Sequence, residues 1–327
     1  MLRSLHTITI ISDYLRNKNK LKSEASSIDD IYNFFIYLQN NKNKFYTLYI
    51  YNYLFNFISS DEVAKRKTSA RVFEDLLAIM CNAKVADDSI RQNIIYAVPN
   101  HFVNAKDIIA SNRREKADVI FRNNYSFSVK TLIVSNSEIN MGSFEKRVLF
   151  DGLNVDNYLG ERKSKGGAGL GSKKQFLKLL ELLESNSNYK KFKDKFNQMA
   201  EFIYSDDLLL AIKNNYKMEL YFFNGDEIVE IFKAHSKDKD SFLKIVNRYE
   251  GNALRIDRNA LIAKCNKQIF LDFSYLKNSV IDLVNQFDYK LHKSYVDYFA
   301  NQNSKHDILA DLENLFKHFD NNFKELA

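Results

Sequence analysis

The chain of 327 residues contains no tryptophan, one proline, nine glycines and two cysteines. The two cysteines, Cys81 and Cys265, are too few for a disulfide scaffold or a cysteine-rich zinc site. The six histidines are scattered and show no metal-ligand spacing. These absences exclude a disulfide-stabilised secreted domain and favour a reduced protein, which we expect to be cytoplasmic.

Long hydrophobic runs are also absent. The most apolar stretch, residues 45–58, is interrupted by Asn52 and Asn56 and is shorter than the roughly 20 residues of a membrane-spanning helix. The N-terminus, Met1-Leu2-Arg3, leads into an apolar patch without a small-residue cleavage site, so we expect no signal peptide. We therefore expect no membrane association.

The overall composition is that of a globular protein. With 45% hydrophobic and 27% charged residues, wholesale disorder is excluded. Lysine and arginine outnumber aspartate and glutamate by 48 to 41, which gives a formal net charge of +7. That surplus favours polyanionic partners, although extra lysine also improves solubility.

The spacing of apolar residues predicts a helix-rich chain with two hairpins. Hairpin strands are expected at 119–121 and 127–134 around Asn123-Asn124, and at 218–223 and 227–232 around Asn224-Gly225. Helices are expected at 28–39, 45–58, 69–82, 88–98, 143–153, 173–184, 276–300 and 304–326. Ser172 is the expected N-cap of the helix at 173–184, and a further helix is expected to follow it and end at about residue 204.

The first hairpin carries the residues best suited to chemistry. Asp118 is followed after nine residues by Ser128-Val129-Lys130. A carboxylate can hold Mg²⁺, and a lysine beside it can steady an attacking water and the charge that grows on phosphorus. Because side chains two apart share one face of a strand, Ser126, Ser128 and Lys130 should line one face while the residues between them enter the core.

The hairpin connection decides whether the acid and the lysine meet. A two-residue turn at Asn123-Asn124 would pair Asp118 with Val129 and turn the acid to the wrong face. A three-residue loop or one bulge would pair Asp118 with Lys130, and asparagine tolerates the left-handed backbone that such a loop needs. An active site therefore predicts an odd-length connection. The alternative is an ordinary surface salt bridge on a hairpin.

The two strands resemble the core of the PD-(D/E)xK nuclease superfamily, and particularly of type II restriction endonucleases. The stretches that carry the resemblance are Ala117-Asp118-Val119-Ile120-Phe121 and Phe127-Ser128-Val129-Lys130-Thr131. The resemblance covers roughly residues 70–185, in the order helix, hairpin, helix. It implies that Asp118 binds Mg²⁺ and that Lys130 positions and polarises the attacking water. Two departures are an alanine before the acid, where proline is usual, and Ser128 in the place of the second acid.

The resemblance leaves the second metal ligand open. Some restriction enzymes with serine at this place draw the missing carboxylate from the following helix, where Glu145 stands at the matching distance. Others use a glutamate on the helix ahead of the hairpin, where Glu74 is the match. Glu145 is preferred to Glu138, because Glu138 falls in an expected loop and Glu145 in the first turn of a helix. For Glu145 and Glu74 alike, the alternative is a solvated helix residue.

Basic segments supply candidate DNA contacts. Four of the nine glycines fall within residues 166–171, among five positive charges. The segment spaces like a phosphate loop, but Ser172-Lys173 reverses the required order and no strand leads into it, so nucleotide binding is rejected. Contact with DNA phosphates suits it better, and a flexible surface loop is the alternative. The residues expected to contact DNA are Lys163, Lys165, Gly167, Gly169, Lys173 and Lys174, together with Arg255 and Arg258, which could reach guanine edges in a major groove or form a charged strand edge.

Together these features predict an α/β protein with a central mixed β-sheet of restriction-endonuclease type, flanked by helices, with helix-rich N-terminal and C-terminal parts. Residues 1–205 would form the catalytic domain, and residues 206–327 a hairpin plus helices for DNA recognition or dimerisation.

The predicted function is sequence-specific, Mg²⁺-dependent hydrolysis of double-stranded DNA by a type II restriction endonuclease. The alternatives are a repair, recombination or transposition nuclease of the same superfamily and a non-catalytic DNA-binding protein. A palindromic target implies a homodimer. The resemblance alone implies a cognate DNA methyltransferase, without a stable complex between the two.

Overall fold

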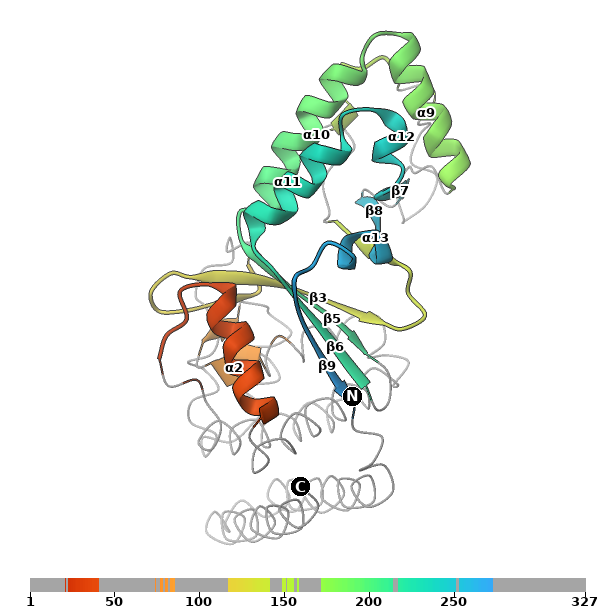
Figure 1. The fold of residues 1–327 in the computed structure, drawn as a ribbon. Helices are drawn as coiled ribbons and strands as arrows, with labels where there is room; N and C mark the ends of the chain where they lie inside the picture. Colours follow the sequence, from red (N-terminus) through yellow and green to blue (C-terminus); the bar gives the residue numbers. More distant parts are fainter. Residues whose placement is uncertain are drawn as a thin grey trace, which may run out of the picture. The chain divides into compact units, whose positions relative to one another are not determined.

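The computed structural model describes residues 23–40, 117–141, 172–213, 217–250 and 253–272, together with Leu21 and shorter pieces between 74 and 85 and between 149 and 158 (Figure 1). These residues form a mixed α/β protein with a central sheet and flanking helices. Among them, no helix combines the length and the apolar character needed to cross a membrane. The helices predicted at 45–58, 88–98, 276–300 and 304–326 lie outside the described residues.

The described elements have the following bounds. They are α2 (Ile28–Asn40), β1 (Lys84–Val85), β2 (Val119–Ile120), β3 (Ser126–Ile133), β4 (Glu138–Asn140), α9 (Lys173–Ser185), α10 (Tyr189–Ile203), β5 (Asp207–Lys213), β6 (Lys217–Phe223), α11 (Gly225–His235), α12 (Lys239–Phe242), β7 (Val246–Glu250), β8 (Ala253–Asp257), α13 (Arg258–Ile262) and β9 (Lys267–Asp272).

Contacts within the chain separate two compact units. Unit 1 comprises Met1–Thr131, Leu209–Leu220 and Ile269–Ala327, and unit 2 comprises Leu132–Leu208 and Tyr221–Gln268. The chain passes from one unit to the other within β3, β5, β6 and β9, so each of these strands contributes residues to both. The predicted domain boundary near residue 205 stays a prediction.

The central sheet has six strands in the order β1-β2-β3-β5-β6-β9. The first hairpin is confirmed, because β2 and β3 pair antiparallel, with Val119 opposite Phe127 and Ile120 opposite Ser126. Strand β5 is buried from Leu208 onwards, which fits an interior strand covered on both faces.

Helix α2 confirms the prediction for residues 28–39. Its buried side chains recur at helical spacing and belong to Ile28, Ile31, Phe34, Phe35 and Leu38. The helix begins with two acidic residues, Asp29 and Asp30, in its first turn, where the positive end of the helix dipole favours negative charge. The Asp30 carboxylate also accepts the backbone N–H of Ser26 at 2.7 Å, which fixes the chain as it enters the helix.

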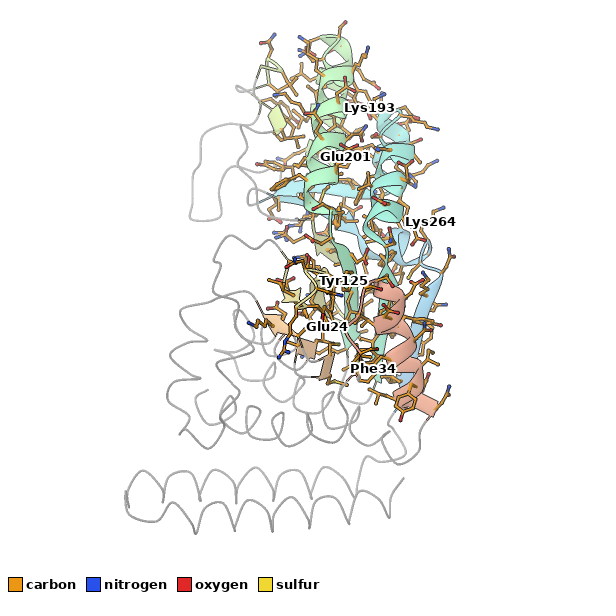
Figure 2. All side chains as sticks on the ribbon, turned by 90° about the vertical axis from the view of Figure 1, so that its left-hand side faces the viewer. Glu24, Phe34, Tyr125, Lys193, Glu201 and Lys264 are labelled. Carbon is orange, nitrogen blue, oxygen red and sulfur yellow. The ribbon has the colours of Figure 1, made fainter. Side chains whose placement is uncertain are left out.

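Unit 2 contains a three-stranded antiparallel sheet in the order β4-β8-β7, packed with helices. Helices α9 and α10 are confirmed, and the predicted N-cap is present, since Ser172 Oγ accepts the Gln175 backbone N–H at 3.2 Å. Helices α10 and α11 lie side by side (Figure 1 and Figure 2), and Glu201 of α10 pairs with Lys233 of α11 at 3.0 Å. Between the elements lies an aromatic core in which the Phe196 and Phe242 rings meet edge to face at 4.8 Å.

The second predicted hairpin is wrong, because Asn224-Gly225 begins helix α11 instead of a turn. The Asn224 side chain accepts the Asp226 backbone N–H at 2.9 Å and so caps the helix. Glycine at 225 serves a close approach, since a Cβ there would lie 2.4 Å from the Tyr204 carbonyl oxygen. The following apolar residues, Ile228 and Phe232, are one helical turn apart and buried.

Candidate functional site

The predicted odd-length connection of the first hairpin is confirmed. Three residues, 122–124, join the strands, and the Phe121 backbone N–H donates to the Tyr125 carbonyl at 2.8 Å across the base of the loop. Asn124 adopts the left-handed backbone with φ of 65°. The Asn123 side chain accepts the Tyr125 backbone N–H at 3.1 Å and donates to the Ala25 carbonyl at 2.8 Å. This one side chain therefore links the loop to Tyr125 and to the segment that precedes α2.

The predicted pairing of Asp118 with Lys130 is wrong, because the register of the two strands is shifted relative to the predicted one. The loop closes one residue earlier than that pairing requires, because Phe121 and Tyr125 pair at its base and their rings lie 5.5 Å apart. Asp118 therefore lies beside Phe127 and Val129 of β3. Its backbone N–H donates to the Phe127 carbonyl at 3.2 Å, and its Oδ2 accepts the Val129 backbone N–H at 2.7 Å.

The alternation predicted for β3 is confirmed. Phe127 and Val129 are buried, whereas Ser126, Ser128 and Lys130 are half-buried and share the other face. The hydrogen bond to Val129 holds the Asp118 carboxylate at the one β3 residue that lies between Ser128 and Lys130 in sequence. The hairpin thus fixes the Asp118 carboxylate at the backbone of Val129, whose neighbours along β3 are Ser128 and Lys130.

The second metal ligand remains a prediction. Glu145 lies outside the described residues. Glu74 lies on a helix, as predicted, and is only 8% exposed, so it is not a solvated helix residue. Within the described part of the chain, no three His, Cys, Asp or Glu side chains form a group that could hold a metal ion. The oxygen chemistry of Asp118 suits Mg²⁺, a hard cation that proteins hold with one or two carboxylates and water.

Glu138 does not lie in a loop, contrary to the prediction, because it begins strand β4. In β4 it lies opposite Asp257 of β8. Both Nε and Nη2 of Arg248, on β7, donate to its Oε2, at 3.1 and 2.8 Å. Glu138 therefore has a structural role that joins the two outer strands of the three-stranded sheet.

The predicted DNA contacts are described only in part. Lys163, Lys165, Gly167 and Gly169 lie outside the described residues. Lys173 and Lys174 are exposed in the first turn of α9, and Lys173 Nζ donates to Asn247 Oδ1 at 3.3 Å.

Arg258 makes contacts that indicate a structural role. It is the first residue of α13, and its Nη1 donates to the carbonyl oxygens of Val134 and Asn136 at 2.8 and 2.7 Å. Its backbone N–H donates to the Ser137 carbonyl at 3.0 Å. The side chain and the backbone of Arg258 thus hold the segment that leads from β3 to β4.

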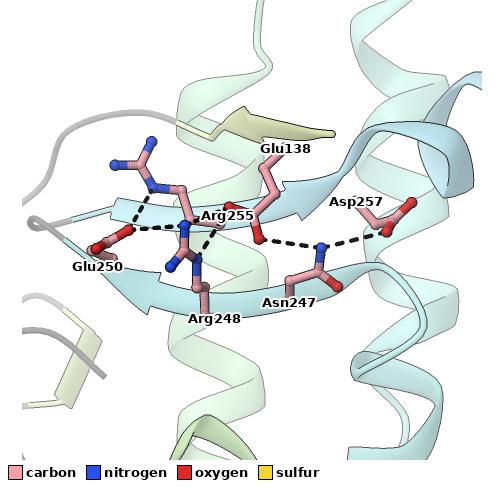
Figure 3. A network of polar contacts seen from close by, with 6 residues as sticks. All are labelled: Glu138, Asn247, Arg248, Glu250, Arg255 and Asp257. Atoms are coloured by element: carbon pink, nitrogen blue, oxygen red, sulfur yellow. Dashed lines mark hydrogen bonds and ion pairs between the residues drawn. The ribbon is translucent and has the colours of Figure 1, made fainter. Parts of the chain in front are cut away.

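Arg255 is placed differently, in the middle strand β8 of the three-stranded sheet (Figure 3). It lies directly opposite Arg248 of β7. Between these strands the ladder skips a residue, because Val246 pairs with Ile256 and Arg248 with Arg255, so Asn247 is an extra residue in a β-bulge. Asn247 Nδ2 reaches Glu138 and Asp257, at 3.4 Å each, which completes a polar network over one face of the sheet.

Lys213, a residue that the sequence analysis missed, is the most perturbed base among the described residues. It ends β5, the neighbour of β3 in the central sheet, and is 3% exposed. Burial lowers the pKa of its amine from 10.5 to about 7. The available signal was a lysine that ends the unbroken apolar run Leu208–Ile212.

Comparison with known proteins adds no assignment. No protein-family model, no curated protein and no solved structure matches this chain.

Proposed function

We propose that the protein is a Mg²⁺-dependent endonuclease that hydrolyses phosphodiester bonds of double-stranded DNA at a specific sequence, as type II restriction enzymes do. The observation that carries the proposal is the Asp118–Val129 hydrogen bond of 2.7 Å, within a hairpin of odd loop length. It holds a carboxylate beside a strand that presents Ser128 and Lys130 on its half-buried face.

In this proposal Asp118 would hold Mg²⁺, with Glu145 or Glu74 as the second carboxylate. The ion would supply Lewis-acid stabilisation of the charge on phosphorus. Lys130 would hold the attacking water by hydrogen bonding and would stabilise negative charge as it develops. Ser128 occupies the place of the usual second acid and contributes a neutral hydroxyl.

The test is cleavage of plasmid DNA by purified protein with MgCl₂, and with EDTA in its place. Lys130→Ala should lower the cleavage rate at least about 100-fold, because a positioned proton-transfer or water-orienting group contributes that much. Asp118→Asn should also abolish cleavage, and its amide oxygen can still accept the Val129 N–H, so the hairpin is retained. Lys84→Ala, which removes an exposed lysine from β1 of the same sheet, should cut like the parent.

The products separate the candidate functions. Discrete fragments support a restriction enzyme, whereas nicking or smearing supports a repair, recombination or transposition nuclease. A gel shift without cleavage supports a non-catalytic DNA-binding protein. In that case the Asp118–Val129 bond would be purely structural, with the carboxylate replacing a backbone acceptor at the end of a strand. If Lys130→Ala cuts as fast as the parent, the site assignment is wrong.

A further inference from the structure

The three-stranded sheet of unit 2 carries two arginines in unequal surroundings. Arg248 is neutralised from both sides, since its Nη2 lies 2.8 Å from Oε2 of Glu138 and 3.1 Å from Oε2 of Glu250. Among the residues that the structure describes, Arg255 has only Glu250 as an acidic partner, and the distance from its Nε to Glu250 Oε2 is 3.9 Å. That distance permits attraction between the charges but is too long for a hydrogen bond.

The position of Arg255 is costly for the fold alone. It lies directly opposite Arg248, and like charges in directly opposed positions of an antiparallel pair destabilise a sheet. Its Nε is buried and has no hydrogen-bond acceptor among the described residues. A buried donor without an acceptor also costs free energy. The contacts that join the strands, by contrast, are made by Arg248, Asn247 and Glu138.

The donors of Arg255 are oriented for an external acceptor. Its two terminal nitrogens point away from the five other labelled side chains (Figure 3). Among the described residues, none of its guanidinium nitrogens makes a hydrogen bond, and the side chain is 28% exposed. A planar guanidinium with free donors is well matched to the two oxygens of a phosphate group.

We propose that Arg255 binds a phosphate group of the nucleic-acid backbone, and that Glu250 balances its charge when no phosphate is bound. The choice of nucleic acid as the source of the phosphate rests on the proposed function. A phosphate is favoured over a guanine edge because Arg255 lies on the middle strand, flanked by β4 and β7. A major groove admits a protruding helix or a two-stranded ribbon, whereas phosphates line the outside of the duplex.

Because Arg255 and Glu250 carry opposite charges, replacing each of them should change the affinity for DNA in opposite directions. Arg255→Gln should weaken binding to a short labelled DNA duplex roughly tenfold, because a charge-assisted hydrogen bond is lost. Glu250→Gln should strengthen binding, because the phosphate no longer competes with a carboxylate for Arg255. In the double variant Glu250→Gln with Arg255→Gln, the strengthening should disappear, since Arg255 is absent and Arg248, the other partner of Glu250, stays paired with Glu138.

Binding is measured by fluorescence anisotropy in EDTA, so that no cleavage occurs, over about 50 to 200 mM KCl. Arg255→Gln should lower the slope of log affinity against log salt by about one unit, equally for two duplexes of unrelated sequence. Lys264→Gln removes an exposed positive charge from the turn after α13 and is the matched control, which should leave the slope unchanged. Thermal unfolding of each variant checks that the sheet is retained.

The proposal is overturned if Arg255→Gln keeps the parental slope, if Glu250→Gln still strengthens binding without Arg255, or if the parent binds no duplex at the lowest salt. A loss that appears with only one of the two duplexes would assign Arg255 to base reading instead. Because binding is read in EDTA, a parent that binds but never cleaves DNA leaves this inference standing while the nuclease proposal fails.

Discussion

Replacing Lys213 with methionine tests the buried lysine directly. Methionine matches the length and flexibility of the lysine side chain but carries no charge. Burial lowers the pKa of Lys213 from 10.5 to about 7 in the folded protein. Below the folded value the amine is protonated in both states, and the fold bears the whole cost of burying its charge. As the pH rises from the folded to the unfolded value, that cost is relieved, so Lys213 makes the parent more stable with increasing pH.

The magnitude follows from the size of the pKa difference. Between the folded and the unfolded pKa, unfolding binds up to one proton, which gives a slope of about 1.4 kcal/mol per pH unit. Between about pH 7.5 and pH 9.5, the stability of the parent relative to Lys213→Met should therefore rise by roughly 2 to 3 kcal/mol. The variant should be the more stable of the two by the largest margin at the lower pH.

The assay is urea denaturation of both proteins across this pH range, with the free energy of unfolding as the readout. Other groups titrate as well: burial raises the pKa of the Cys81 thiol to about 12, so this thiol withdraws stability from both proteins as the pH rises above 9. Such contributions cancel in the difference between parent and variant. Lys217→Met, which removes an exposed lysine that pairs with Asp272 at 3.0 Å, is the control for the loss of a surface lysine. A constant difference for Lys213→Met would refute the reasoning.

Two further substitutions test contacts in unit 2 by urea denaturation. Gly225→Ala should destabilise the protein by about 1 to 3 kcal/mol, because its new methyl group would overlap a backbone carbonyl, although alanine ordinarily improves a helix; an unchanged or higher stability would contradict the close approach. Arg258→Gln should cost about 1 to 3 kcal/mol and speed hydrogen exchange across residues 134–137, because two carbonyl oxygens lose their donor. Unaltered exchange there would show that the two hydrogen bonds of Arg258 do not stabilise this segment.

The elements predicted correctly are those whose signals are local. Ser172 caps α9 through a residue three positions on, and the apolar spacing of α2 reflects a single buried face. The hairpin of β2 and β3 follows from alternation and a short loop. Asn224-Gly225 misled because the same two residues suit a turn and a helix start. The deciding feature, the carbonyl oxygen of Tyr204 beside Gly225, comes from a segment some twenty residues earlier.

The candidate site was predictable in kind but not in detail. Spacing and alternation predicted an odd-length loop and a face shared by Ser128 and Lys130, yet the position of Asp118 depended on which residues close the loop, and these are Phe121 and Tyr125. Long-range contacts left no signal at all. Arg258 is joined to carbonyl oxygens more than a hundred residues away, so nothing in its neighbourhood distinguishes it from Arg255.

The bulge at Asn247 allows β7 to contain one residue more than a regular strand would. An additional residue in a regular strand reverses every side chain beyond it, so that core residues would face water. Here the ladder absorbs the additional residue, and Tyr249 remains buried while Arg248 and Glu250 keep to the network face. A relative without the residue at position 247 would thus keep the same interior packing, and Arg248 would still lie opposite Arg255. It would lack the side-chain amide that bridges Glu138 and Asp257.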